Sequence, residues 1–187
     1  MAKRLQPGST EYTALFDGFE HTAYRLETLQ RYQQDDETEP LQRFLADEDQ
    51  PHDPAKDRWV ARIAAATAAG KTMQRVHIVV EPPSDYLRYE LKWSYGPNVT
   101  AGEDIRIIPV RTGGWPAGLP RHDYWLFDSR LLCRMHYDEE MRFALAELIE
   151  DPAEIVKANH WRDAALHTAI PYHEYLASRA DMLRRAS

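Results

Sequence analysis

Hydrophobic and polar residues alternate along residues 22–32, as they do in a half-buried β-strand. Later parts of the chain contain short apolar runs of strand length that are rich in β-branched and aromatic residues. These runs are residues 74–80, 104–110, 124–127, 131–136 and 143–149. The pattern therefore predicts a sheet of five or six strands, in which 124–127 and 131–136 pair as a hairpin.

Stretches with apolar residues at helical spacing separate these strands, and several have their ends marked by capping residues. Ser, Asp and Pro stand where helix starts require them, at Ser9, Asp53-Pro54, Ser84 and Asp151-Pro152. Gly70 is placed to end the helix that begins at Pro54, and Gly96-Pro97 to end the helix that begins at Ser84. A last helix is expected from Pro171.

This order of elements predicts an α/β protein with a mixed sheet flanked by helices and a C-terminal pair of helices. A length of 187 residues is that of one ordinary domain, so we expect residues 1–187 to form a single domain. In it, an acidic N-terminal part (residues 1–55) wraps an α/β core (residues 56–170), and residues 171–187 form a C-terminal helix.

Charge is unevenly distributed along the chain. The sequence has 30 acidic and 23 basic residues, a net charge of −7 with neutral histidines. Residues 1–60 hold 13 acidic and 7 basic residues, a net of −6, whereas residues 71–134 hold 7 and 9, a net of +2. Because an acidic chain is repelled by phosphates, we predict that the isolated protein does not bind nucleic acid.

The compartment is predicted from three features. Cys133 is the single cysteine and cannot form an internal disulfide. The N-terminal residues MAKRLQPGST lack the apolar stretch of a secretory signal, and no apolar run is long enough to cross a membrane. We expect a soluble, cytoplasmic protein without membrane association.

Motifs with well-defined chemistry are not found in the sequence. Gly70-Lys71-Thr72 ends a predicted helix instead of beginning one, which excludes a P-loop, and Cys133 lies in an apolar strand as an inert thiol. His136 and Asp138 could share a strand face, with His77 as a distant partner, but no ligand spacing is that of a recognised metal site. The sequence therefore predicts no metal and no cofactor.

The densest group of ionisable and aromatic residues follows the strand at 74–80, where ligands bind in open α/β sheets. Asp85 and Arg88 are one helical turn apart, and Arg88 would clamp an acidic group of a ligand. An ordinary salt-bridged helix is the alternative. The candidate ligand-binding residues are Asp85, Tyr86, Arg88 and Glu90, with Trp125, Asp128 and His136 from the predicted hairpin.

Four blocks of the sequence resemble the signature blocks of an actinobacterial family of domains of unknown function, DUF6879. The blocks are AYRLETLQRY, VVEPPSDYLRYEL, NVTAGEDIRIIP and DYWLFDSRLLCRMHYD, and the resemblance extends from about Leu15 to Leu176. Members are often encoded beside helix-turn-helix regulators of the XRE type. The resemblance implies an accessory role next to such a regulator.

The order of elements is also similar, more weakly, to one half of the phospholipase D fold. The similarity rests on the helix, glycine and strand at Trp59–Val80, the hairpin, and the helix at Asp151–Trp161. Catalytic members carry Lys two residues after a His, and none of the eight histidines here is followed in that way. The similarity implies a non-catalytic relative.

These observations favour a non-catalytic regulatory or accessory protein that binds a small ligand or a helix-turn-helix regulator. The alternative is a tailoring enzyme of secondary metabolism that uses the candidate carboxylates and His136 as acid and base. Direct nucleic-acid binding through residues 71–134 is a third and weaker interpretation. The sequence leaves open whether the chain forms a homodimer.

Overall fold

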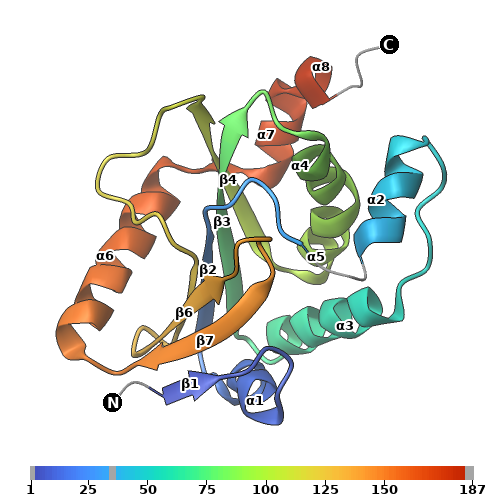
Figure 1. Ribbon diagram of the computed structural model, residues 1–187. Helices are drawn as coiled ribbons and strands as arrows, with labels where there is room; N and C mark the ends of the chain where they lie inside the picture. The colour runs from blue at the N-terminus through green and yellow to red at the C-terminus, as the bar shows by residue number, and fades with distance from the viewer. Residues whose placement is uncertain (1–2, 34–36, 184–187) are drawn as a thin grey trace.

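A mixed β-sheet forms the centre of the molecule (Figure 1). The computed structural model describes residues 3–33 and 37–183. In them, eight strands lie in the order β1-β7-β6-β5-β2-β3-β4-β8. Their bounds are β1 Lys3–Leu5, β2 Thr22–Glu27, β3 Thr72–Glu81, β4 Asp104–Arg111, β5 Tyr124–Phe127, β6 Leu131–Tyr137, β7 Phe143–Ile149 and β8 Ile170–Pro171. The predicted α/β fold with a mixed sheet is confirmed, with eight strands instead of five or six.

Two short edge strands account for the larger number. β1 pairs with β7 and β8 pairs with β4, both antiparallel, and they are only 3 and 2 residues long. Strands of this length show no alternation in the sequence and form because a neighbouring strand offers unpaired backbone groups. The predicted first strand also ends earlier, at Glu27, because the carboxylate of Asp123 accepts the Thr28 N–H in place of a strand partner.

The helices begin where the capping residues predict. Ser9, Asp53, Ser84 and Asp151 each accept a backbone N–H from the first turn of their helix. The helices are α1 Thr10–Gly18, α2 Thr38–Leu45, α3 Pro54–Ala68, α4 Asp85–Tyr89, the π-helix η2 Glu90–Ser94, α5 Tyr95–Ala101, α6 Pro152–Thr168, α7 Tyr172–Ser178 and α8 Ala180–Leu183. The predicted end of the last helix, residues 184–187, lies outside the described residues. None of the described helices has both the length and the apolar character needed to cross a bilayer.

The helix that starts at Ser84 does not stop at Gly96-Pro97, contrary to the sequence prediction. It continues to Ala101 because residues Glu90–Ser94 wind as a π-helix. The wider turn shifts the hydrogen-bond register, so that Pro97 falls in the first turn of α5, where a missing N–H is tolerated. The same π-helix places Glu90 on the buried side, with 6% of its surface exposed.

Helices cover both faces of the sheet, with α6 on one side and α1, α3 and the α4 to α5 segment on the other (Figure 1). On the α6 side, Tyr24, Leu26 and Val76 are buried in an apolar core that includes Ala158 and Ala165 of α6. A strand covered on both faces has to bury both sets of its alternating side chains. The opposite face of β2 and β3 therefore also lies in the interior.

That opposite face contains charged residues at the middle of the sheet. β2 lies between β3, to which it is parallel, and β5, to which it is antiparallel. The register sets Arg25 beside Arg75 and Glu27 beside His77. Because alternate residues of a strand share a face, all four side chains lie on the side of α1 and α3. The N-terminal part of the chain thus contributes a central strand, in addition to its surface segments.

Replacing Gly102 with alanine is expected to lower the free energy of unfolding by about 2 to 3 kcal/mol. Gly102 ends α5 with φ of 110°, and a Cβ at this position would collide with the side chain of Thr67 in α3. Urea denaturation followed by circular dichroism measures the loss. The matched control is Gly18→Ala, because Gly18 has no atom near its absent Cβ and should tolerate the methyl group. Equal losses in the two variants would contradict the prediction.

Candidate functional site

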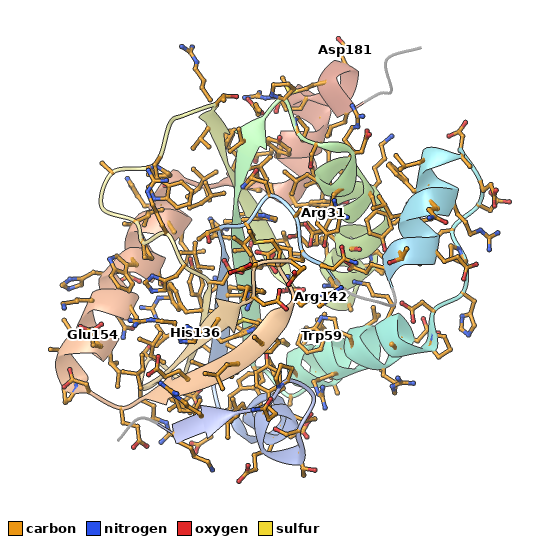
Figure 2. The ribbon with its side chains drawn as sticks, viewed as in Figure 1. Arg31, Trp59, His136, Arg142, Glu154 and Asp181 are labelled. Carbon is orange, nitrogen blue, oxygen red and sulfur yellow. The ribbon has the colours of Figure 1, made fainter. Side chains whose placement is uncertain are left out.

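A cavity of about 410 Å³ lies between the sheet and the helices α1, α3 and η2. Its walls are mainly aromatic, and they include Tyr12, Phe16, Trp59, Trp125, Tyr137 and Phe143. Phe16 holds the rings together, with its centroid 5.0 Å from that of Trp125 and 5.3 Å from that of Trp59. Figure 2 shows Trp59 on α3, at the side of the sheet opposite α6. The cavity presents flat apolar surfaces to whatever enters it.

The floor of the cavity contains two buried arginines, Arg25 and Arg75, which pair with buried carboxylates. Arg75 Nη1 donates to Glu27 Oε1 at 2.6 Å, and Arg75 Nε donates to Glu103 Oε1 at 2.9 Å. Arg25 Nη2 donates to Asp123 Oδ2 at 2.9 Å, and its guanidinium lies 5.5 Å from the ring centroid of Trp125. Burial of charge is tolerated here because each arginine meets a carboxylate.

Asp123 links the loop after β2 to the hairpin. Its carboxylate accepts hydrogen bonds from the N–H and hydroxyl of Thr28, at 2.8 and 2.7 Å. It also accepts from the hydroxyls of Tyr32 and Tyr137, at 2.7 and 3.0 Å, and from Arg25. Only 1% of the Asp123 surface is exposed, so hydrogen bonds from protein donors replace those that its carboxylate would accept from water.

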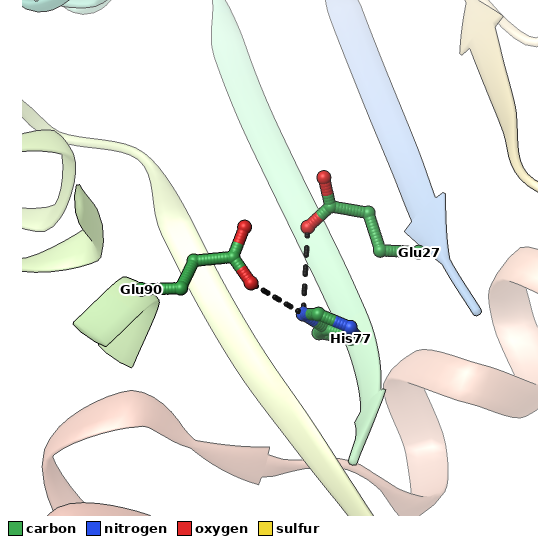
Figure 3. Close-up of side chains that lie close together, drawn as sticks. All are labelled: Glu27, His77 and Glu90. Atoms are coloured by element: carbon green, nitrogen blue, oxygen red, sulfur yellow. Dashed lines mark ion pairs between the residues drawn. The ribbon is translucent and has the colours of Figure 1, made fainter. Parts of the chain in front are cut away.

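A second group of ionisable residues, Glu27, His77 and Glu90, lies close together (Figure 3), and its Glu27 pairs with Arg75. His77 Nδ1 is 3.7 Å from Glu27 Oε2 and 3.5 Å from Glu90 Oε2. Tyr95 Oη is 2.7 Å from the same nitrogen and 2.6 Å from Glu27 Oε2. We refer to Glu27, His77 and Glu90 as the carboxylate–histidine cluster.

The environments of the two glutamates drive their pKa values apart. Burial disfavours the ionised form of both, but Arg75 and Arg25 outweigh it at Glu27 and hold the pKa of that carboxyl well below its usual range. At Glu90, burial and the charge of Glu27 act together and raise the pKa well above the ordinary value. Burial also lowers the pKa of His77, so its ring is neutral at neutral pH.

The seven residues predicted from the sequence do not form one cluster. Glu90 and Trp125 line the cavity. Tyr86 is buried nearby, and its hydroxyl donates to Glu37 at 2.9 Å. Asp85 and Arg88 pair with each other at the surface, as in the alternative of a salt-bridged helix, and neither lines the cavity.

The two remaining candidates lie away from the cavity. Asp128 accepts the backbone N–H groups of Glu20, His21 and Thr22, and so ties the β5 to β6 turn to the start of β2. His136 pairs with Glu147 at 3.0 Å, on the part of the sheet near α6 in Figure 2. Of the two segments that supply these candidates, η2 reaches the cavity through Glu90 and the hairpin reaches it through Trp125.

Sequence reasoning named His77 only as a distant partner of His136 and Asp138, and it did not bring together the residues that form the floor and the cluster. Arg25, Glu27, Arg75 and His77 stand at alternate positions of two strands that are covered on both faces, and that pattern was the available signal. Charged side chains on a doubly covered strand must be buried, and buried charges require partners. Asp123 and Glu103 supply those partners from distant parts of the chain.

The fold and the site define an α/β protein with paired buried charges beneath an aromatic cavity. The chain belongs to the family described as Domain of unknown function (DUF6879), whose model matches residues 10–177. Among solved structures, it is similar to the phosphatidylserine synthase of Haemophilus influenzae Rd KW20, with a TM-score of 0.45 and 10% sequence identity. The similarity covers 97% of this chain and 45% of that chain, so this chain spans less than half the length of the synthase. No curated protein shows significant sequence similarity to it.

Proposed function

We propose that this protein is a small-molecule-binding protein with a regulatory or accessory role, and that the aromatic cavity is its ligand site. The observation that supports the proposal is the cavity itself, since about 410 Å³ lies in the size range of ligand pockets. Aromatic walls with a few polar groups are also typical of such sites.

Lys56 is the protein group that would bind the polar end of the proposed ligand. The residue lines the cavity, and its ammonium group forms no hydrogen bond or ion pair with any residue that the structure describes. Burial, followed by the charge of Arg75, lowers the pKa of Lys56 to about 8, which leaves it mostly charged at pH 7. Arg25 and Arg75 are already neutralised by carboxylates. The site therefore favours a flat apolar molecule with one acidic group.

The probe 8-anilinonaphthalene-1-sulfonate has this chemistry and is expected to bind the folded chain with a saturable 1:1 stoichiometry. Lys56→Gln should weaken binding about tenfold, the value of one charge-assisted hydrogen bond. Binding to the unmodified chain should weaken as the pH rises through about 8, because Lys56 loses its charge. Fluorescence titration measures both effects.

The control for this titration is Lys157→Gln. Lys157 pairs with Glu154 on α6, at the other face of the sheet, and its loss should leave binding unchanged. The proposal fails if the probe does not saturate, or if the two lysine variants weaken binding equally.

The partner in the regulatory role is proposed to be a helix-turn-helix regulator of the XRE type. This part of the proposal is supported by the sequence blocks quoted above. A direct test is whether this protein and a purified XRE-type regulator form a complex on size-exclusion chromatography. A second measurement is whether Lys56→Gln changes the affinity of the two proteins for each other. Separate elution at micromolar concentrations would contradict it.

An enzyme is the second candidate, and the carboxylate–histidine cluster favours it. The raised pKa of Glu90 keeps its carboxyl neutral, as in a general acid, and the lowered pKa of Glu27 keeps its carboxyl ionised, as in a general base. Active sites often contain such a pair. In an enzyme, Glu90→Gln would abolish turnover of a substrate that still binds. In a binding protein, the same variant would have no reaction to abolish.

A further inference from the structure

The protonation of His77 is determined by a backbone contact. His77 Nε2 is 2.8 Å from the carbonyl oxygen of Leu29. A carbonyl can only accept, so Nε2 carries the ring proton, and Nδ1 of the neutral ring presents a lone pair. That lone pair faces the carboxylates of Glu27 and Glu90 (Figure 3).

The carboxylate–histidine cluster has more acceptors than donors. The hydroxyl of Tyr95 lies between His77 Nδ1 and Glu27 Oε2, and its single proton can serve only one of them. Glu90 is 6% exposed, and its Oε2 atom is buried without a hydrogen-bond partner in the part of the chain that the structure describes. With Glu90 ionised, His77 Nδ1, Glu27 Oε2 and Glu90 Oε2 are three electron-rich atoms that converge on one point, which is costly in a buried site without a cation.

The charges around the cluster show the same deficit. The buried cations are the guanidinium groups of Arg25 and Arg75, and the buried anions are the carboxylates of Glu27, Glu90, Glu103 and Asp123. With all four carboxyls ionised, as metal binding would require of Glu90, they outnumber the two cations by two. At the cavity, the half-buried Lys56 adds one positive charge and Glu37 one negative charge, so the excess is unchanged. One divalent cation would balance the group.

We propose that Glu27, His77 and Glu90 form a binding site for one divalent transition-metal ion, with zinc as the reference ion. The distances fit, because ligands bound at about 2.1 Å in a tetrahedral site lie about 3.4 Å from one another. The separations from Nδ1 are 3.5 and 3.7 Å, and all three ligand atoms lie within 4.8 Å of one another. Imidazole with carboxylates is a ligand set used by zinc and iron, and three protein ligands leave a fourth position open.

The surroundings hold these ligands in position. The Leu29 carbonyl fixes the ring of His77 through Nε2, as carbonyls commonly do for metal-bound histidines. Arg75 holds Oε1 of Glu27 at 2.6 Å and leaves Oε2 directed at His77. Glu27, Glu90 and Tyr95 also line the aromatic cavity, so the open position adjoins the proposed ligand site. The metal proposal does not depend on the ligand proposal.

The test is a zinc titration of the chelator-treated full chain by isothermal titration calorimetry. We expect one zinc ion per chain, and a visible absorption band of four-coordinate geometry when cobalt(II) replaces zinc. Glu90→Gln removes a ligand while keeping its shape, and should weaken zinc binding by about 100-fold or more. Zinc should raise the melting temperature of the unmodified chain and not that of the variant.

The matched control is Glu147→Gln, which alters a surface histidine–carboxylate pair, His136 with Glu147, and should leave zinc binding unchanged. Circular dichroism establishes that both variants are folded. The proposal is overturned if the unmodified chain takes up no zinc, or if Glu90→Gln binds zinc as tightly.

Discussion

Replacing Arg75 with methionine is expected to lower the free energy of unfolding by about 3 to 5 kcal/mol, the usual cost of removing one partner of a buried ion pair. Methionine keeps much of the volume but leaves Glu27 and Glu103 facing each other without their shared cation. Urea denaturation monitored by far-UV circular dichroism gives the value. Failure of the variant to fold at 25 °C would agree with the same cause.

Arg88→Met is the control for this experiment. Arg88 is half-buried and pairs with the exposed Asp85, and a partly exposed pair of this kind contributes about 1 kcal/mol or less. The same variant tests the sequence prediction that Arg88 clamps an acidic group of the ligand. If that prediction is right, Arg88→Met should lose binding of 8-anilinonaphthalene-1-sulfonate. If Arg75→Met is no less stable than Arg88→Met, the buried pairs do not contribute as described.

Asp123→Asn should destabilise the fold by about 3 kcal/mol or more, although it changes the volume of the side chain very little. All five hydrogen bonds to Asp123 are donated to it, by Thr28, Arg25, Tyr32 and Tyr137. The amide of asparagine brings two further N–H donors into a site without acceptors and removes the counterion of Arg25. Thermal and urea unfolding measure the loss.

Asp138→Asn provides the comparison for Asp123. Asp138 is exposed in the β6 to β7 turn and accepts only the backbone N–H groups of Glu140 and Arg142. An asparagine oxygen can accept both, so this variant should unfold close to the unmodified chain. A similar loss in both variants would mean that the buried donors around Asp123 are not the cause.

The parts of the fold that depend on neighbouring residues could be predicted from the sequence. Asp53 and Asp151 begin helices because their carboxylates reach N–H groups two or three positions ahead. The end of the helix after Ser84 could not be predicted, because the π-helix is stabilised by packing of Glu90 and Leu91 in the interior. β1 and β8 depend on strands more than sixty residues away in the sequence, at Ala146 and Arg106.

The candidate site was predicted only in part, for a physical reason. Glu90 and Trp125 lie in aromatic, ionisable segments that are visible in the sequence, and both line the cavity. Glu27 and His77 become neighbours only through the parallel register of β2 and β3. No local pattern encodes that register, so a cluster built across it is invisible until the sheet is known.

The hydrogen bond between Arg25 and Asp123 joins residues 98 positions apart. At ordinary rates of translation, Arg25 is synthesised about 5 to 20 s before its partner. During that interval β2 lacks β5, and its two charges remain in water. The nascent N-terminal half is therefore kept from early collapse onto this face, and the core closes only when the hairpin arrives. A chain cut before residue 123 should stay bound to chaperones instead of folding.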